Sequence, residues 1–311
     1  MFIWSLVIGI WDFRPPDCLL TPSHNLATVI LVDVQLQTKF DRLRELLRGY
    51  GSVLVAYSGG VDSAFLARVA HDTLGAKALS VIADTPSLPR RELAEALRLG
   101  EAFAFPVRVV KTEEFQNNDY VSNPPNRCYF CKHELFDKLT PVARAMGIAV
   151  IVYGENASDI GDFRPGAEAA AKFEVRAPLK EAGLTKADIR ALSAHLGLPT
   201  ADKPQMACLS SRVPYGEPVT PQALAMIEAA ENALWDLGFF DVRVRHHRGG
   251  ANGAVPFARI EVAPDQIVRL TENSVRDTIV NRLKEIGYAY VTLDMQGYRR
   301  GSANEVLAGK K

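Results

Sequence analysis

The hydrophobic pattern of the first half of the chain alternates between two kinds of segment. Continuous apolar runs, typical of strands buried on both faces, alternate with segments whose apolar residues recur as on one side of a helix. We expect strands at residues 53–57, 78–83, 107–110 and 149–153, and helices at 40–48, 63–74, 90–103 and 132–146. This order predicts an α/β fold, a parallel sheet flanked by helices, with ligand sites at the carboxyl ends of the strands.

The pattern changes after Lys180. A helix at 186–196 and a proline-punctuated segment at 198–221 come first, followed by expected helices at 222–237 and 274–286 and expected strands at 242–246, 258–262 and 290–293. This order predicts a smaller C-terminal α+β domain with an antiparallel sheet. We therefore expect three parts: an extension at 1–37, disordered or misassigned, which contains Cys18; an α/β domain at 38–205; and the α+β domain at 206–311.

The composition limits the class of protein. A chain of 311 residues of which 48% are apolar buries a substantial core, so a globular protein is expected. Lys and Arg together number 36, as do Asp and Glu, which argues against a strongly basic surface and a nucleic-acid partner. The apolar stretch at 1–10 is too short to span a bilayer, and no Lys or Arg precedes it. We therefore expect a cytoplasmic protein with neither signal nor anchor.

The junction of the first strand and the following helix carries a phosphate-binding signal. Residues 58–63 read SGGVDS, so free backbone N–H groups and the positive end of a helix dipole meet there. Glycines let the backbone approach an anion closely, the Ser58 and Ser63 hydroxyls can donate hydrogen bonds, and Asp62 is placed to hold Mg²⁺. The segment lacks both the Gly-Lys-Ser/Thr ending of P-loops and the spaced glycines of dinucleotide folds.

The same segment resembles the SGGxDS signature of the PP-loop ATP-pyrophosphatase superfamily, which implies cleavage of ATP between its α and β phosphates. The expected ATP contacts in and beside the loop are Ala56, Ser58, Gly59, Gly60, Val61, Asp62 and Ser63. Asp84 ends the second strand, where nucleotide folds often hold the ribose or adenine. Gly154 and Asp159 follow the fourth strand; Asp159 is either a second magnesium or ATP contact or a surface carboxylate. Arg127 is a further candidate ATP contact.

Three cysteines lie in two polar segments. Cys128 and Cys131 form a Cys-x-x-Cys just before an expected helix, whose N-terminus, with Arg127 and Lys132, should stabilise thiolates. Cys208 lies in a proline-rich loop. In a reducing cytoplasm such thiols bind metal or do chemistry more often than they form disulfides. They could hold three irons of a [4Fe–4S] cluster and leave the fourth iron open; a zinc site and a metal-free redox or nucleophilic thiol set are the alternatives.

Positive charges in the C-terminal part point to an anionic substrate. Arg243 and Arg245 alternate with valines on an expected strand, so the arginines share one face and the valines the other. We expect the arginines to bind a substrate phosphate or carboxylate; a solvated polar face is the alternative. The candidate substrate residues are Ser211, Arg212, Glu231, Arg243, Arg245 and Glu261. Glu231 and Glu261 could position substrate or metal, and a surface carboxylate is the alternative for each. A surface role is expected for His246 and His247, with contact to the anion as the alternative.

Several segments together resemble the LarE family: residues 123–132, 154–159, 162–166, 177–181, 202–216 and 297–302, within a match that runs from about 40 to 305. The resemblance implies an enzyme that uses ATP and Mg²⁺ to adenylate a carboxylate of pyridinium-3,5-biscarboxylic acid mononucleotide and replaces it with a thiocarboxylate. The product feeds the nickel-pincer nucleotide cofactor of lactate racemase and related enzymes. We expect a homo-oligomer with a small-molecule substrate.

The resemblance also implies two sulfur sources. One type of family member sacrifices the sulfur of a single cysteine and leaves dehydroalanine, whereas the other carries a three-cysteine cluster whose free iron binds hydrosulfide. The presence of Cys128, Cys131 and Cys208 together favours the cluster type, with sulfide or another sulfur donor as co-substrate. Cys208 departs from the position of the sacrificial cysteine.

Other activities share the phosphate loop. A tRNA-thiolating enzyme would need a basic RNA-binding surface or an added RNA module, and an amide-forming synthetase would need a glutaminase partner. The sequence shows no such surface, module or domain. A non-enzymatic nucleotide-binding or metal-binding module is the third alternative, and the complete loop argues against it.

Overall fold

The structure, a computed structural model, describes residues 26–159, 165–204, 207–299, 301–302 and 305. Some residues named or included in motifs in the sequence analysis lie outside these ranges, namely Cys18, Asp162, Phe163, Arg164, Gln205, Met206 and Arg300. The chain divides into two compact units, Met1–Thr38 and Lys39–Lys311. The periodicity predicted that the first helix begins at residue 40, whereas helix α1 (Leu26–Tyr50) begins earlier, at Leu26. Residues 26–48 contain no glycine or proline that would end a helix.

The parallel sheet forms as the hydrophobic pattern predicts. Its four strands have the order β3-β2-β1-β4, and each neighbouring pair is parallel. The strands are β1 (Val53–Tyr57), β2 (Ala78–Asp84), β3 (Val107–Lys111) and β4 (Val150–Tyr153), and the helices between them include α2 (Val61–Leu74), α3 (Arg90–Ala102) and α5 (Arg127–Ala145). Parallel strands need such crossovers. The predicted α/β class is confirmed.

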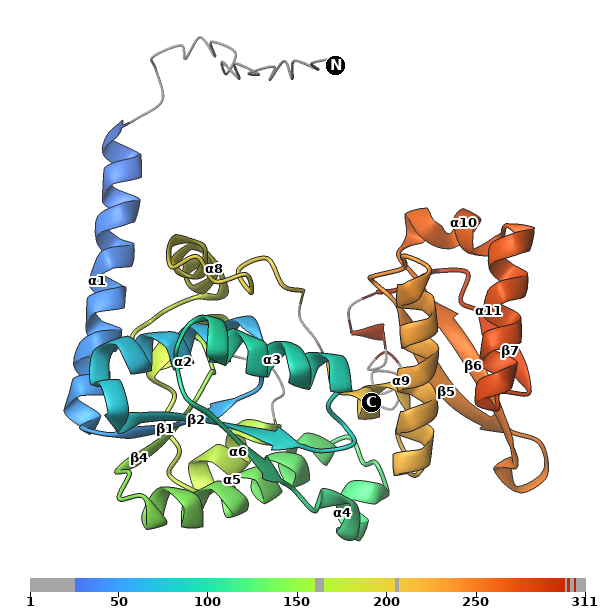
Figure 1. The fold of residues 1–311 in the computed structure, drawn as a ribbon, viewed down its shortest axis with the longest axis horizontal. Coiled ribbons are helices and arrows are strands. Elements are labelled where there is room, and N and C mark those ends of the chain that lie inside the picture. Colours follow the sequence, from blue (N-terminus) through green and yellow to red (C-terminus); the bar gives the residue numbers. More distant parts are fainter. Residues whose placement is uncertain (1–25, 160–164, 205–206, 300, 303–304, 306–311) are drawn as a thin grey trace, which may run out of the picture. The chain divides into compact units, whose positions relative to one another are not determined.

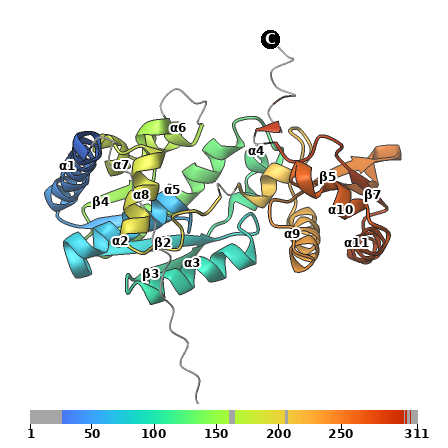
Figure 2. The same ribbon diagram turned by 90° about the horizontal axis from the view of Figure 1, so that it is seen from above.

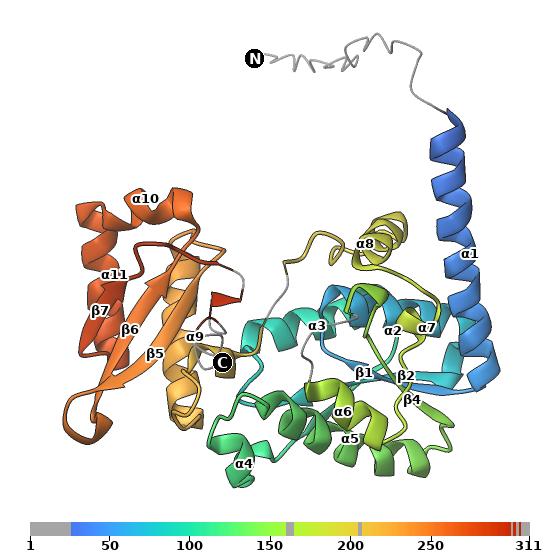
Figure 3. The same ribbon diagram turned by 180° about the vertical axis from the view of Figure 1, so that it is seen from behind.

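Helices cover both faces of this sheet (Figure 1, Figure 3). On one face, Leu54 and Val81 of the sheet pack against Phe136 of α5 and Ala169 of α6 (Pro165–Lys172). Helices α2 and α3 lie on the other face. Because β1 is buried along its whole length, its residues form a continuous apolar run in place of an alternation.

Shorter elements complete this part of the chain: η1 (Gly75–Lys77), η2 (Glu114–Gln116), α4 (Asn118–Val121), η3 (Ala157–Asp159), α7 (Pro178–Glu181) and η4 (Leu209–Arg212). Helix α8 (Lys186–His195) begins with a capping box. The Thr185 hydroxyl accepts a hydrogen bond from the Asp188 N–H at 3.2 Å, and the Asp188 carboxylate accepts one from the Thr185 N–H at 2.9 Å. This box fixes the backbone at the start of α8.

The C-terminal sheet is mixed. Its order is β5-β6-β7, with β5 (Arg243–Gly249) antiparallel to β6 (Val255–Glu261), and β6 parallel to β7 (Tyr290–Leu293). The expectation of an antiparallel sheet is therefore wrong for β7. Helices α10 (Ile267–Thr271) and α11 (Asn273–Ile286) separate β6 from β7, and such a helical crossover returns the chain in the same direction.

Helices α9 (Pro221–Asp236) and α11 cover one face of this sheet (Figure 2). Leu234 and Leu283 of these helices share a core with Val244 and Ile260 of the strands. The alternate strand residues therefore lie on the opposite face, and these include the charged side chains of β5 and β6. Within the described residues, no helix combines the length and apolar character needed to cross a membrane.

Gly59 limits the geometry of the loop after β1. Its φ is +72°, and a Cβ there would lie 2.7 Å from the Cβ of Ala96 on α3. Gly75 also has a positive φ, +58°, but a Cβ there would have nothing within 4 Å.

We expect Gly59→Ala to lower the free energy of unfolding by about 2–4 kcal/mol, from backbone strain plus overpacking, and Gly75→Ala by about 1 kcal/mol. Urea unfolding measures both values, and equal losses would contradict the role of the Ala96 contact.

Candidate active site

A compact loop joins β1 to α2. The Ser63 hydroxyl accepts a hydrogen bond from the Ser58 N–H at 3.1 Å, lies 3.0 Å from the Ser58 hydroxyl, and donates to the Gly60 carbonyl at 3.1 Å. Gly60 is the N-cap of α2, so the free N–H groups of the first helical turn lie beside this loop. Free N–H groups and the helix dipole stabilise a phosphate at such a point. The predicted strand, loop and helix are confirmed, and contact with ATP remains a prediction.

The end of β4 approaches this loop closely. A Cβ at Gly154 would lie 3.0 Å from the Ser63 nitrogen and 3.2 Å from the Asp62 Cβ, so a larger residue would force a shift. Asn156 donates from Nδ2 to Asp62 Oδ2 at 3.4 Å. Lys186 Nζ lies 2.9 Å from each of the two Asp62 carboxylate oxygens. Lys186 reaches the loop from a distant part of the chain, and no sequence pattern distinguished it.

Two other carboxylates expected at the nucleotide have protein partners. Asp84, at the end of β2, forms an ion pair with Arg90. Asp159, in η3, accepts a hydrogen bond from the Asn156 N–H at 3.2 Å. Both residues follow strands of the parallel sheet, as expected, and their contact with ATP or Mg²⁺ remains a prediction.

Arg127 connects the two cysteine segments. It begins α5, is 5% exposed, and donates to the Ser210 carbonyl at 3.1 Å and to the Asn123 side chain. Burial lowers its pKa, but Cys208 and Cys128 raise it, and the net direction is upward. The structure thus places Arg127 with the cysteines, and its predicted contact with ATP remains a prediction.

The cysteine thiols influence one another electrostatically, but they are not preformed as a metal site among the described residues. Cys128 and Cys131 lie in the first turns of α5, because this helix begins at Arg127 and not at residue 132. Desolvation and then Cys208 raise the pKa of Cys131 to about 12, and the same two causes raise the pKa of the Cys128 thiol, although the Cys128 residue is exposed. Both directions are opposite to the stabilisation of thiolates that the helix N-terminus, Arg127 and Lys132 suggested, because desolvation outweighs the nearby cations. In the part of the chain that the structure describes, no group of three or more His, Cys, Asp or Glu is arranged to hold a metal ion.

A buried cluster of hydroxyls holds the Cys208 segment. Ser87 Oγ lies 2.6 Å from the Tyr120 hydroxyl and 2.9 Å from Ser210 Oγ, and the latter two are 2.9 Å apart. The Leu209 N–H donates to the Ser87 carbonyl at 2.9 Å. Buried hydroxyls need such partners, so the cluster fixes the η4 segment against the loop after β2. The sequence had no signal for these residues, because isolated Ser and Tyr in loops are common.

Glu114 is a second residue that the sequence did not reveal. Its side chain is 2% exposed; Oε1 accepts a hydrogen bond from Thr85, and Oε2 has no hydrogen-bond partner among the described residues. Glu114 lies near Cys131, since it contributes to raising the pKa of that thiol. A buried carboxylate oxygen without a partner costs stability, and such groups are found at functional sites.

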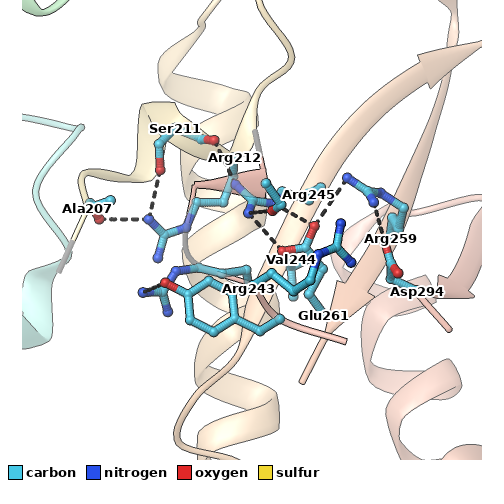
Figure 4. A network of polar contacts seen from close by, with 12 residues as sticks. Ala207, Ser211, Arg212, Arg243, Val244, Arg245, Arg259, Glu261 and Asp294 are labelled. Carbon is cyan, nitrogen blue, oxygen red and sulfur yellow. Dashed lines mark hydrogen bonds and ion pairs between the residues drawn. The ribbon is translucent and has the colours of Figure 1, made fainter. Parts of the chain in front are cut away.

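A buried ion pair holds the other side of the Cys208 segment (Figure 4). The Arg212 guanidinium is 1% exposed and donates to both carboxylate oxygens of Glu231 on α9, at 2.9 and 3.0 Å. It also donates to the carbonyls of Ala207 and Cys208, at 2.7 and 3.0 Å. Glu231 accepts a further hydrogen bond from the Val244 N–H at 3.0 Å. Arg212 and Glu231 therefore bind each other, and their contact with substrate remains a prediction.

The charged face of β5 and β6 is buried. Arg245 donates to both carboxylate oxygens of Glu261, at 2.9 and 2.7 Å, and Arg259 lies 3.2 Å from the same carboxylate (Figure 4). Arg245 also donates to the Ser211 carbonyl at 3.0 Å. The exposed fractions of Arg243, Arg245 and Glu261 are only 5%, 7% and 1%. The alternative of a solvated polar face is therefore wrong, whereas the alternation with core valines is confirmed.

Arg243 differs from its neighbours. Among the described residues it forms no ion pair with a carboxylate; it donates to the Val242 carbonyl at 2.7 Å, and its guanidinium lies 4.7 Å from the centre of the Tyr298 ring. Burial, and then Arg212, lowers its pKa. A buried cation without an anionic partner is costly, so Arg243 is the best candidate to bind an anion.

The histidines that follow Arg245 are not surface residues. His246 is 4% exposed, and its Nδ1 lies 3.2 Å from the Tyr288 hydroxyl. His247 is partly buried, and its ring stacks on that of Phe257 with 5.1 Å between centroids. Burial, with smaller contributions from Arg248 and His247, lowers the pKa of His246 to about 4. The expected surface role is wrong for His246, because the pleat of β5 directs its side chain into the protein.

The fold and the loop define the class of protein. A parallel sheet flanked by helices, with an SGGVDS loop between β1 and α2, places the chain in the PP-loop superfamily of α/β proteins. No protein-family profile matches the chain.

Curated relatives identify the family within this class. The chain is 34% identical over 273 residues to the pyridinium-3,5-bisthiocarboxylic acid mononucleotide synthase of Lactiplantibacillus plantarum, a match that covers 88% of this chain and 96% of that protein. It is 41% identical over 272 residues to an uncharacterized protein of Synechocystis sp., covering 88% and 99%. It is also 26% identical over 247 residues to an uncharacterized protein of Methanocaldococcus jannaschii, covering 79% and 90%. The chain belongs to the LarE family.

The ion pair between Arg212 and Glu231 should be strongly coupled, because removal of one partner leaves the other charge buried. We expect Glu231→Gln and Arg212→Met each to lower the free energy of unfolding by about 3 kcal/mol. The double variant should lose clearly less than the sum, since no charge remains unpaired. Urea unfolding of the four proteins gives the coupling free energy, and additive losses would show that the pair does not interact.

Burial of His246 should make stability depend on pH. The folded protein keeps this imidazole neutral down to about pH 4, whereas the unfolded chain protonates it below its ordinary pKa of 6.5. The unfolded state therefore binds more protons in this window, and stability falls as the pH drops from 6.5 toward 4. We expect His246→Gln to reduce the difference between urea midpoints at pH 7 and pH 5, and substitution of the exposed His195 to leave it unchanged. The same difference in His246→Gln as in the wild type would contradict this assignment.

Proposed function

We propose that this protein is an ATP-dependent sulfur transferase. It adenylates a carboxylate of pyridinium-3,5-biscarboxylic acid mononucleotide and converts the acyl adenylate to a thiocarboxylate for synthesis of the nickel-pincer nucleotide cofactor. The observation that carries this proposal is that Arg127, next to Cys128, donates to the carbonyl of Ser210, two residues after Cys208, at 3.1 Å, in a chain that also holds a PP-loop. Sulfur transfer to a carboxylate needs both a sulfur site and an activating nucleotide. The name of the L. plantarum relative supports the choice of acceptor.

The loop after β1 would bind the phosphates of ATP. The hydroxyls of Ser58 and Ser63 lie 3.0 Å apart beside the start of α2, where the first N–H groups of the helix are free. Asp62 fits a cation, because the Lys186 ammonium already lies 2.9 Å from both of its oxygens. Mg²⁺ bound there would neutralise phosphate oxygens. A carboxylate oxygen of the substrate attacks the α-phosphorus, the bond to the β-phosphate bridge breaks, and pyrophosphate leaves.

The C-terminal arginines would hold the acceptor. Arg243 has no carboxylate partner among the described residues, so its buried guanidinium is available to a phosphate or carboxylate of the mononucleotide. A sulfur nucleophile then adds to the activated carbonyl carbon. The carbon–oxygen bond to the adenylate breaks, AMP leaves with the electron pair, and nearby cations stabilise the negative charge that develops.

We also propose that Cys128, Cys131 and Cys208 hold three irons of a [4Fe–4S] cluster. The donor set fits in kind and number, since all three thiols are free and Cys208 acts on the pKa of both others. When bound, such a cluster supplies an iron without a protein ligand, where hydrosulfide can be held. Because the described side chains form no ready-made metal group, cluster binding would reorient at least one of them. We further expect a cytoplasmic homo-oligomer. Light scattering measures the oligomeric state.

Two measurements test this function. Anaerobic purification followed by iron and acid-labile sulfide assays tests the cluster, and an iron-free protein that is fully active would overturn it. Incubation with ATP, Mg²⁺, sulfide and the biscarboxylated mononucleotide should give a thiocarboxylate, detected by mass spectrometry, with AMP and pyrophosphate. Pyrophosphate release that tRNA stimulates and the pyridinium nucleotide does not would overturn the proposed acceptor.

The adenylation and sulfur steps should separate by mutation. We expect Asp62→Ala to lower pyrophosphate release by about 100-fold or more, because a ligand for the metal that neutralises the phosphates is lost. Cys208→Ala should leave the first-turnover release of pyrophosphate close to wild type and abolish thiocarboxylate formation. Asp72→Ala, on the exposed side of the same helix α2, is the matched control and should change neither step. Equal loss of both steps in Cys208→Ala would contradict this division.

A further inference from the structure

We propose that Lys186 is a mobile cation of the ATP site: it occupies the magnesium position on Asp62 in the nucleotide-free protein and moves to the phosphates of ATP when Mg²⁺ takes its place. This inference rests on the proposed ATP chemistry. It gives a role to a contact between two segments of the chain that no sequence motif connects.

The geometry of the contact is that of a bound cation. Lys186 Nζ lies 2.9 Å from Oδ1 and 2.9 Å from Oδ2 of Asp62, so the ammonium is centred on the carboxylate. Asn156 adds a weaker hydrogen bond to Oδ2 at 3.4 Å. A magnesium ion binds carboxylate oxygen at about 2.1 Å, closer than the Lys186 ammonium, and carries twice its charge. Mg²⁺ and the Lys186 ammonium therefore compete for the Asp62 carboxylate.

The backbone around Lys186 is fixed, so its motion is confined to the side chain. The Lys186 N–H donates to Ser158 Oγ at 3.0 Å, and the capping box of Thr185 and Asp188 holds the first turn of α8. The Lys186 side chain, 32% exposed, has four rotatable methylene groups between this fixed backbone and the charge. The ammonium can therefore move several ångströms without any change in the fold.

The displaced ammonium would remain beside the phosphates. Asp62 lies in the first turn of α2, directly after the loop whose N–H groups bind phosphate in the proposed function. The Lys–Asp pair is partly exposed, with side-chain exposures of 32% and 20%, and such pairs contribute little to stability. A polyphosphate with its magnesium offers the ammonium a stronger anion, so the exchange favours the nucleotide complex. Lys186 would then stabilise the charge that develops on the leaving pyrophosphate.

The chain offers a closely matched control for this contact. Lys39 forms an ion pair with Asp188, also on α8, at 2.7 Å, with side-chain exposures of 35% and 22%. Lys39→Met therefore removes a Lys–Asp pair of similar length and exposure that joins α1 to α8 and does not include Asp62. Lys186→Arg keeps the positive charge at the proposed site.

Three readouts test the proposal with wild type, Lys186→Met, Lys186→Arg and Lys39→Met. Electron paramagnetic resonance of free Mn²⁺ should show that Lys186→Met binds Mn²⁺ without nucleotide at least about tenfold more tightly than wild type, because Asp62 has lost its competing cation. Calorimetry with α,β-methylene-ATP and Mg²⁺ should show binding about 10- to 100-fold weaker in Lys186→Met, because a phosphate contact is lost. Pyrophosphate release should fall by about 100-fold in Lys186→Met and by less than about tenfold in Lys186→Arg. Lys39→Met should match wild type in all three.

Each result bears on one part of the proposal. Unchanged Mn²⁺ binding in Lys186→Met would overturn the occupation of the magnesium position, and unchanged affinity for α,β-methylene-ATP would overturn the transfer to phosphate. Both of these measurements require no acceptor and no sulfur. If the wild type released no pyrophosphate with the pyridinium nucleotide, the proposed function would fail while these two readouts still decided the role of Lys186.

Discussion

The buried ion pair between Arg212 and Glu231 is the interaction on which the C-terminal half depends. Glu231 receives both the Arg212 guanidinium and the Val244 N–H, so one carboxylate joins α9, β5 and the segment that ends in η4. Arg212 also restrains the backbone at Cys208, because it donates a hydrogen bond to the Cys208 carbonyl at 3.0 Å. A single guanidinium with several fixed donors can hold a loop in this way, whereas a lysine would supply a point charge without defined directions.

The Cys208 segment is held from the other side by groups of the α/β part of the chain. Ser210 takes part in the hydroxyl cluster with Ser87 and Tyr120, and its carbonyl accepts from Arg127, the residue that precedes Cys128. Ser87 follows β2, whose end is a predicted nucleotide contact. The Cys208 segment, the start of α5 and the loop after β2 therefore share a set of buried hydrogen bonds, and buried polar groups of this kind tolerate few alternative arrangements.

The charged side chains are paired differently where ATP is expected to bind and where the acceptor is expected to bind. Where ATP is expected, Asp62 is paired with the partly exposed Lys186, a contact that a metal ion can replace. Where the acceptor is expected, Arg212 and Arg245 are paired with Glu231 and Glu261, whereas Arg243 has no carboxylate ion pair among the described residues, and burial followed by Arg212 lowers its pKa. The two ion pairs fix the positions of Arg212 and Arg245. Arg243, which has no carboxylate partner among the described residues, is the cation that we propose binds a ligand. Desolvation that exceeds the effect of opposite charges explains why the pKa values of Arg243, Cys128 and Cys131 shift toward the neutral form.

Features that depend on neighbours along the chain could be predicted from the sequence. The apolar runs of β1 and β2, the SGGVDS junction and the alternation of valine with arginine on β5 were predictable, because strand, turn and helix preferences are local. The pairing of charges depends on the tertiary fold, which brings Lys186 to Asp62 and Arg212 to Glu231 through contacts between distant segments. The tertiary fold also determines that the arginine face is buried, that β7 runs parallel to β6, and that desolvation raises the thiol pKa values. Burial and partner choice arise from packing between elements, and a one-dimensional pattern carries no record of that packing.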